Sequence, residues 1–152
     1  MMGGVTRTDA LDGALTLPDG CRVRGRGLRH GLPAGPTPEY GLYLGAGRLR
    51  RRHDPELAWP HAWVDWPDFL LPRDADAAVD LIRDLHARGC AGERVEVACG
   101  GGVGRTGTVI ACLAVLAGVA PDDAVAWARE HHDRRAVETP WQRRWVARFP
   151  DA

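Results

Sequence analysis

Apolar and polar positions follow a strand-then-helix order along this chain. From Asp74 to Arg88 apolar residues recur at helical spacing, with Asp74 or Asp76 as the N-cap and Gly89 as the stop. Residues 94–98 then alternate as a short strand. The apolar run that follows predicts a buried helix over Thr106–Leu116, because it is too short for a membrane span.

The remaining pattern is more irregular. Short strands are expected in the Gly-, Pro- and Arg-rich first third and just before Pro67, and prolines open two late helices. The arginine-rich segment Leu49–His53 is interpreted as a solvated loop, in preference to a substrate-facing patch. The expected strands cover Ala14–Leu17, Cys21–Val23, Gly41–Leu44 and His61–Trp66, and the late helices Pro121–His131 and Pro140–Arg148.

Strand, loop and helix in repeated order predict an α/β fold, with a central, mostly parallel sheet flanked by helices. The 152 residues fit a single domain. Within it we expect residues 1–60 to form an irregular, β-rich part and residues 61–150 to form the core that carries the chemistry.

The composition argues against nucleic-acid and membrane binding and indicates the cellular compartment. The 20 basic residues, all arginine, balance 20 acidic ones, so no overall field favours nucleic acid or an anionic membrane. The four cysteines form no CxxC pair, and the chain does not open with an export signal, which indicates a reduced, cytoplasmic protein. Cys90 and Cys112 are expected to be small buried residues, while Cys21 is left unassigned.

The stretch from Cys99 to Arg105 carries the chemistry. A cysteine ends a predicted strand, Gly100, Gly101, Gly102, Val103 and Gly104 follow, and Arg105 opens a helix. Such a loop turns successive backbone N–H groups into one concavity that binds a tetrahedral oxyanion. Arg105 can hold two phosphate oxygens at once, which lysine cannot. The same groups stabilise a thiolate, so the anion site also activates the nucleophile.

Two nucleotide-binding interpretations compete. Residues 102–107 match GxGxxG literally, but a second helix stands where a dinucleotide fold requires a strand ending in an acidic residue. A Walker loop requires a lysine where Arg105 stands and a glycine where Cys99 stands. Both interpretations are therefore disfavoured.

At these residues the chain resembles the protein tyrosine phosphatase superfamily, whose motif is His-Cys, five residues, Arg, then Ser or Thr. Cys99, Arg105 and Thr106 match its positions. Trp66-Pro67-Asp68 resembles the mobile loop that carries the general acid, at the expected distance before the cysteine. Ala98 departs from the motif histidine, from which we expect a rate optimum shifted to higher pH.

The resemblance implies a role for each residue. Cys99 attacks phosphorus, Asp68 protonates the leaving oxygen and later deprotonates water, and Thr106 donates a hydrogen bond to the sulfur. Gln142 would orient that water, although with Thr139 it also fits a helix capping box. Asp65 is the rival acid. His131 and His132 are expected to be surface residues.

The sequence therefore predicts a phosphatase for phosphotyrosine-type monoesters, needing neither cofactor nor metal. The expected partners are phosphorylated proteins or small phosphomonoesters, not nucleic acid, and no membrane span is expected. Dual-specificity or phosphoinositide activity, a phosphate-recognising pseudophosphatase, and arsenate reduction or sulfur transfer stay open as alternatives.

Overall fold

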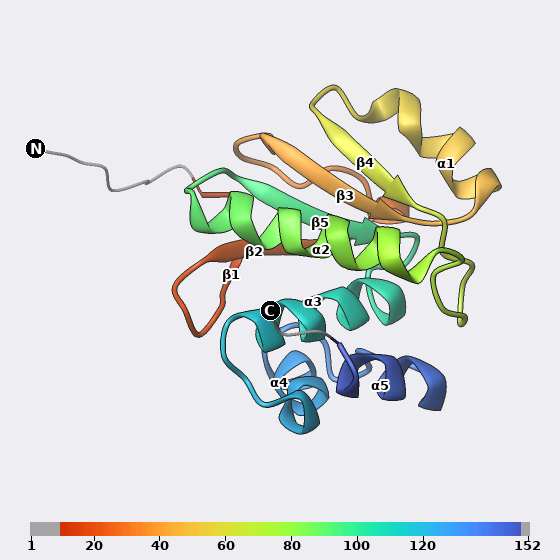
Figure 1. Cartoon of the computed structure of the whole chain (residues 1–152). Coiled ribbons are helices and arrows are strands. Elements are labelled where there is room, and N and C mark those ends of the chain that lie inside the picture. The colour runs from red at the N-terminus through yellow and green to blue at the C-terminus, as the bar shows by residue number, and fades with distance from the viewer. Residues whose placement is uncertain (1–9, 150–152) are drawn as a thin grey trace, which may run out of the picture.

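A five-stranded sheet forms the centre of the computed structural model, which describes residues 10–149 (Figure 1). The strand order is β1-β2-β5-β3-β4, in which β1 is antiparallel to β2 and all other neighbours are parallel. The mostly parallel sheet predicted from the sequence is confirmed. The strands are β1 (Leu15–Thr16), β2 (Arg22–Gly27), β3 (Tyr40–Leu44), β4 (His61–Val64) and β5 (Val95–Cys99).

Helices cover both faces of this sheet. On one face lie α2 and α3, with α4 and α5 packed beyond α3, and α1 lies across the sheet from them (Figure 1). Within residues 10–149 no helix has the length and apolar character needed to cross a membrane. The helices are α1 (Gly47–His53), α2 (Ala75–Cys90), α3 (Gly104–Leu116), α4 (Ala124–His131) and α5 (Pro140–Ala147), with 3-10 turns at Leu28–His30, Asp54–Glu56 and Pro121–Asp123.

Strand β5 separates two cores. Val95, Val97 and Cys99 belong to the large cluster with α2 and α3, whereas Ala98 packs in a smaller cluster with Tyr43. This alternation follows from the pleat of a strand. It directs the Cys99 side chain toward the helices and that of Ala98 away from them.

Glu96 forms a buried charge network under the α1 side of the sheet. Its carboxylate accepts hydrogen bonds from Arg24, Arg26 and the Tyr43 hydroxyl, and the side chain is fully buried. Burial alone would raise the pKa of Glu96, but the hydrogen bonds, led by that from Arg26, bring it below its ordinary value. The network ties together the three central strands β2, β5 and β3.

Two sequence predictions about element boundaries are wrong. Leu49–His53 belongs to α1 and is not a loop. Helix α2 begins at its Asp74 N-cap as predicted but continues through Gly89 to Cys90. Gly89 permits close packing here, because an added Cβ would lie 2.8 Å from the backbone oxygen of Arg22.

The cysteines also differ from expectation. Cys21 and Cys90 form a disulfide, and Cys90 is exposed, so the predictions of a buried Cys90 and of fully reduced cysteines are wrong. The reason is tertiary: the approach of α2 to the start of β2 brings together two residues 69 positions apart. Cys112 is buried as predicted, and burial raises the pKa of its thiol.

Candidate active site

The candidate nucleophile lies where β5 passes into α3. Cys99 is the last residue of β5, and α3 begins at Gly104. The sulfur accepts a hydrogen bond from the Gly102 backbone N–H at 3.2 Å. Because the first N–H groups of a helix have no intrahelical partner, the α3 N-terminus adds donors and the positive end of a dipole to the same loop. The predicted strand, loop and helix geometry is thus present.

Gly102 shapes the loop. It adopts a φ of +78°, which residues with a side chain rarely adopt, and an added Cβ would lie 2.5 Å from the backbone nitrogen of Gly27. The loop therefore packs directly on the end of β2, which leaves no room for a side chain at Gly102.

Gly102→Ala is expected to lower the free energy of unfolding by about 2–3 kcal/mol, because it combines backbone strain with a steric clash. Urea denaturation checks this. Gly118→Ala is the matched control, since Gly118 also has a positive φ but no atom within 4 Å of an added Cβ. An equal loss in both variants would show that the close packing against Gly27 contributes nothing.

Arg105 connects the Cys99 loop to the segment that contains Asp68. Its side chain is almost fully buried, and one terminal nitrogen donates to the Trp66 carbonyl at 2.9 Å. The Arg105 Nε lies 3.5 Å from Asp68 Oδ1, and within the described chain this buried Nε has no hydrogen-bond partner. The guanidinium, which lies beside the Asp68 carboxylate, thus still has an N–H group free to donate. A phosphate clamp requires such free donors.

The Asp68 segment is fastened to α5. Phe69 adopts a φ of +63°, and its carbonyl accepts a hydrogen bond from the Trp141 indole at 2.6 Å. The Leu70 carbonyl accepts from both the Trp66 indole and the Gln142 amide. Strain at Phe69 is therefore held by contacts with another element, which is how strained loops persist at functional sites.

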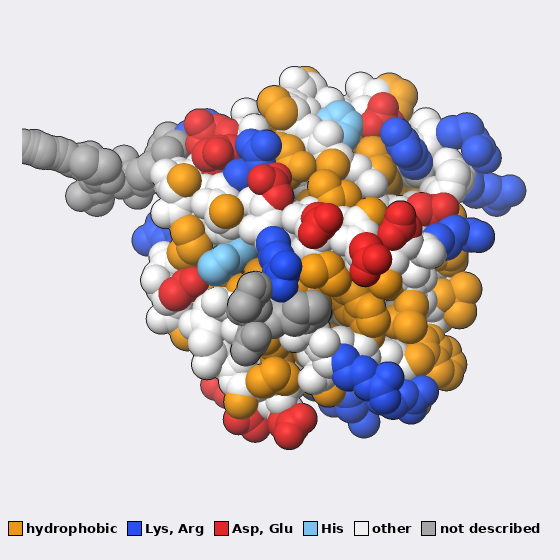
Figure 2. Space-filling view, viewed as in Figure 1, with side chains coloured by type: hydrophobic (Ala, Val, Ile, Leu, Met, Phe, Trp, Pro, Cys, Tyr) orange, Lys and Arg blue, Asp and Glu red, His pale blue; other side chains and the backbone are white. Residues whose placement is uncertain are grey.

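Apolar side chains surround this segment. Phe69, Leu70 and Trp141 are between 41% and 53% exposed. Figure 2 shows hydrophobic side chains gathered along the right-hand edge of this face, from the N-terminal end of α2 toward α5. The rim of the candidate site on this side is thus apolar.

The two candidate acids lie in different surroundings. Asp68 is next to Arg105, whereas Asp65 pairs with Arg73 at 3.2 Å. Asp65 also accepts the Arg73 backbone N–H through its own carbonyl. The structure therefore places Asp68, and not Asp65, beside the predicted clamp.

Thr106 and Gln142 are both buried, with different amounts of free hydrogen-bonding capacity. The Thr106 hydroxyl has no hydrogen-bond partner among residues 10–149, so it can donate to a sulfur or an oxyanion. Gln142 forms the capping box with Thr139, and its amide also donates to Leu70. Its water-orienting role stays a prediction, and these contacts favour the structural alternative.

Two further residues contact the loop although the sequence interpretation gave them no role. His132 Nε2 lies 2.7 Å from the Gly102 carbonyl. The Glu138 carboxylate lies against Gly104. Burial raises the pKa of Glu138 above its ordinary value, and the nearby Asp68 carboxylate raises it further. No sequence spacing indicates these contacts, because the segment between α4 and α5 meets the loop only in the folded chain.

A cavity of about 460 Å³ opens beside Asp68 and Arg105. Part of its wall is the arginine-rich helix α1, so this segment is not simply a solvated surface. Cys99 is 2% exposed and does not line the cavity. The lining residues are Arg29, Ala46, Arg48, Leu49, Arg52, His53, Asp68 and Arg105.

Residues 71–148, just over half of the chain, match the family model described as Swiss Army Knife protein, DSP-PTPase phosphatase domain. A relative from Methanocaldococcus jannaschii, uncharacterized protein MJECL20, is 38% identical over 92 residues, which are 59% of each chain. The chain spans between 55% and 59% of the length of this protein and of MJ0215 from the same organism.

Solved structures share the fold at low sequence identity. The active form of Tk-PTP has a TM-score of 0.61 at 18% identity, over 88% of this chain and 92% of that one. The kinase associated phosphatase whose catalytic cysteine is replaced by serine has a TM-score of 0.60 at 17% identity, over 74% and 68%. The predicted single-domain α/β architecture is thus shared with phosphatases.

Proposed function

The chain belongs to the DSP-PTPase phosphatase domain family, in the dual-specificity branch of the protein tyrosine phosphatase superfamily, and on this premise we propose that it hydrolyses phosphomonoesters through a cysteinyl-phosphate intermediate. One observation carries the proposal. Arg105, six residues after Cys99 at the start of α3, has its guanidinium beside Asp68 at a cavity. The candidate clamp from the Cys99 loop and the candidate acid from the segment after Trp66 thereby meet at this cavity.

In the first step the Cys99 thiolate attacks phosphorus, and an S–P bond forms as the P–O bond to the leaving group breaks. The leaving oxygen takes the proton of Asp68, since an unprotonated alkoxide or phenoxide leaves poorly. Arg105 and the loop amides hold the equatorial oxygens, whose negative charge they neutralise.

In the second step water attacks the phosphorus, and the S–P bond breaks to release inorganic phosphate. Asp68, now ionised, accepts the proton of that water. The free hydroxyl of Thr106 stabilises the departing sulfur anion by donating a hydrogen bond. The chain thus uses the same acid and base group twice.

Trapping the intermediate tests this proposal. The chain is mixed with an aryl phosphate, quenched in acid during turnover, and digested for mass spectrometry. We expect a phosphoryl adduct on the peptide that contains Cys99. A pseudophosphatase would bind the compound without adduct or product, and a persulfide on Cys99 would indicate sulfur transfer instead.

The cavity favours substrates with a second anionic group. Arg48 and Arg52 line it together with Arg105, and cationic walls attract polyanions. We propose that the substrate carries further phosphate or carboxylate groups beside the phosphate that is cleaved. This feature favours the phosphoinositide alternative over an isolated phosphotyrosine.

Arg52→Gln is expected to lower kcat/KM for an inositol polyphosphate by roughly 3- to 10-fold, with a smaller change for a simple aryl phosphate, because it removes one charge from the wall. Initial rates with both substrates at low salt check this. Arg51→Gln is the control, since Arg51 lies on the same helix but does not line the cavity. Equal losses in both variants would contradict a role for the cavity.

Glu138→Gln is expected to tighten sulfate binding by roughly 3- to 10-fold at neutral pH, because it removes a carboxylate beside Asp68 and Arg105. Since the pKa of Glu138 is raised, the carboxyl stays neutral to a higher pH than usual, and the two proteins should converge in acid. Sulfate inhibition constants across pH check this. Glu130→Gln, at an exposed position of α4, should match wild type.

A further inference from the structure

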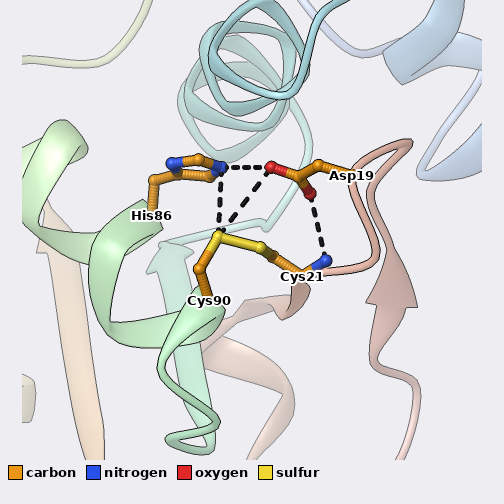
Figure 3. Close-up of side chains that lie close together, drawn as sticks. All are labelled: Asp19, Cys21, His86 and Cys90. Carbon is orange, nitrogen blue, oxygen red and sulfur yellow. Dashed lines mark hydrogen bonds and ion pairs between the residues drawn. A yellow bond between two sulfur atoms is a disulfide. The ribbon is translucent and has the colours of Figure 1, made fainter.

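Four side chains of metal-binding type meet at the end of the sheet remote from Cys99. Asp19 and Cys21 come from the turn between β1 and β2, and His86 and Cys90 from the last turns of α2. Figure 3 shows all four pointing toward one another. Their ligand atoms all lie within 4.8 Å of one another.

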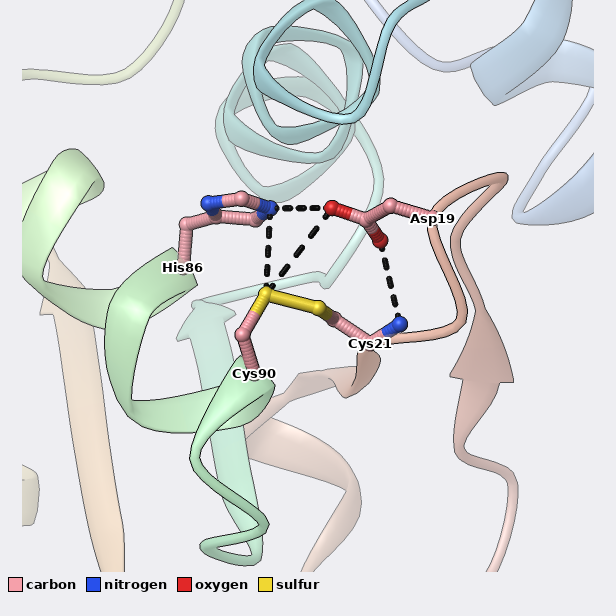
Figure 4. The surroundings of a disulfide bond; sticks show 4 residues. All are labelled: Asp19, Cys21, His86 and Cys90. Carbon is pink, nitrogen blue, oxygen red and sulfur yellow. Dashed lines mark hydrogen bonds and ion pairs between the residues drawn. A yellow bond between two sulfur atoms is a disulfide. The ribbon is translucent and has the colours of Figure 1, made fainter.

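The disulfide also has a histidine and an aspartate beside it, which the S–S bond itself does not need. His86 Nε2 lies 3.4 Å from the Cys90 sulfur and 2.7 Å from Asp19 Oδ2, and that oxygen lies 3.8 Å from the same sulfur. Figure 4 shows the imidazole and the carboxylate facing the Cys21–Cys90 bond from the same side. Two sulfurs, one imidazole nitrogen and one carboxylate oxygen form a complete ligand set for tetrahedral zinc.

The backbone presents these ligands in a suitable arrangement. His86 and Cys90 are four residues apart on α2, so they share one face of the helix. Asp19 Oδ1 accepts the Cys21 backbone N–H at 3.0 Å, which orients the carboxylate and leaves Oδ2 directed at His86. In tetrahedral zinc sites the ligand atoms are roughly 3.3–3.8 Å apart, which matches the His86–Cys90 and Asp19–Cys90 distances, whereas the His86–Asp19 pair and the two sulfurs must move apart to hold the metal.

We propose that Asp19, Cys21, His86 and Cys90 form a zinc site whenever the Cys21–Cys90 disulfide is reduced. A dithiol reductant supplies two electrons and two protons, which break the S–S bond to give two thiols while the dithiol becomes a disulfide. Zn²⁺ then displaces both thiol protons and binds the two thiolates, the imidazole and the carboxylate. The reverse exchange, in which a small disulfide takes two electrons and two protons from the metal-free thiols and becomes a dithiol, restores the S–S bond.

Both states connect the same elements. Either the S–S bond or the metal joins the β1–β2 turn to α2, so the N-terminal hairpin stays attached under oxidising and reducing conditions. The site is also independent of the proposed phosphatase activity. Gly27 at the far end of β2 is the register partner of Cys99, and Cys21 lies six residues earlier, roughly 20 Å away along the strand.

Cobalt binding tests the proposal. The protein carries Cys99→Ser, so that the candidate nucleophile cannot bind metal, and is reduced with a phosphine under nitrogen before titration with Co²⁺. We expect one equivalent to bind, with visible bands of tetrahedral cobalt and an ultraviolet sulfur-to-cobalt charge-transfer band, and Zn²⁺ to displace it. The oxidised protein should show neither band. Zn²⁺ should also raise the Tm of the reduced protein only.

Substitutions distinguish Co²⁺ binding at this four-residue site from nonspecific binding of Co²⁺ to thiols. His86→Ala leaves the disulfide possible but should weaken Co²⁺ binding at least about 10-fold, since even loss of an outer-shell partner costs that much. Cys90→Ser should abolish the charge-transfer band, whereas Cys112→Ala should retain it. Absence of sulfur-bound cobalt in the reduced protein would overturn the proposal. So would unchanged affinity in His86→Ala, which keeps the test decisive if Cys90→Ser does not fold.

Discussion

Cys99→Ser is expected to lower the rate of aryl phosphate hydrolysis on the order of 10⁴-fold or more, as loss of an activated nucleophile does in other covalent mechanisms. A serine hydroxyl remains protonated where a thiol ionises, so it cannot attack phosphorus in the same way. The loop amides and Arg105 are unchanged, so sulfate should still bind. Steady-state rates and calorimetric titration with sulfate measure the two properties separately.

Cys112→Ala is the matched control for this prediction. Cys112 is, like Cys99, a free and buried cysteine, but it lies within α3, roughly 12 Å along the helix from the end of the Cys99 loop. Its removal should leave kcat nearly unchanged. If Cys99→Ser retained most of the hydrolysis, or if Cys112→Ala lost it, the assignment of the nucleophile would be wrong.

Asp68→Asn is expected to lower kcat by roughly 10²- to 10⁴-fold, the usual contribution of a positioned general acid. The loss should be larger for aryl phosphates with poor leaving groups, because they depend most on protonation of the departing oxygen. The fall in rate on the alkaline side of the pH–rate profile should also flatten, because a general acid must be protonated to act. A series of aryl phosphates of graded leaving-group acidity, assayed from acid to alkaline pH, checks both effects.

Asp65→Asn provides the control for Asp68→Asn. Asp65 is three residues earlier in the same segment, but its carboxylate pairs with Arg73 and not with Arg105. We expect activity within about threefold of wild type, because exposed ion pairs contribute little to stability. A dependence on leaving group that appears in Asp65→Asn instead would transfer the acid role to Asp65.

The second prediction concerns a group that α5 helps to position. Trp141 and Gln142, the second and third residues of α5, donate hydrogen bonds to Phe69 and Leu70. Asp68 immediately precedes this anchored pair. The orientation of the acid therefore depends on a helix that lies more than seventy residues further along the chain, and the capping box at Thr139 fixes where that helix begins.

Local sequence determined the elements that carry the chemistry. The apolar run of α3, the alternation of β5 and the glycines between them predict a strand, an anion-binding loop and a buried helix around Cys99. The structure confirms the strand and the buried helix on either side of the glycine-rich loop. These features depend on backbone preferences and burial over ten to fifteen residues, so no distant contact is needed to infer them.

Tertiary structure decided which residues face one another. Glu96 alternates like a solvent-facing strand residue, yet it is fully buried and accepts hydrogen bonds from two arginines. Arg52 belongs to a charged run that local pattern assigns to solvent, yet it lines the cavity at Arg105. In both cases the environment is set by residues distant in sequence, which no local periodicity encodes.

The pairing of Cys21 with Cys90 also depends on the tertiary structure. Nothing in the spacing of the four cysteines connects these two, because the connection arises where Gly89 lets α2 approach the start of β2. The sequence by itself determined the strand, loop and helix around Cys99, since that stretch is contiguous. Only the fold decided what surrounds it and what joins the opposite end of the sheet, because those contacts require segments distant in sequence to meet.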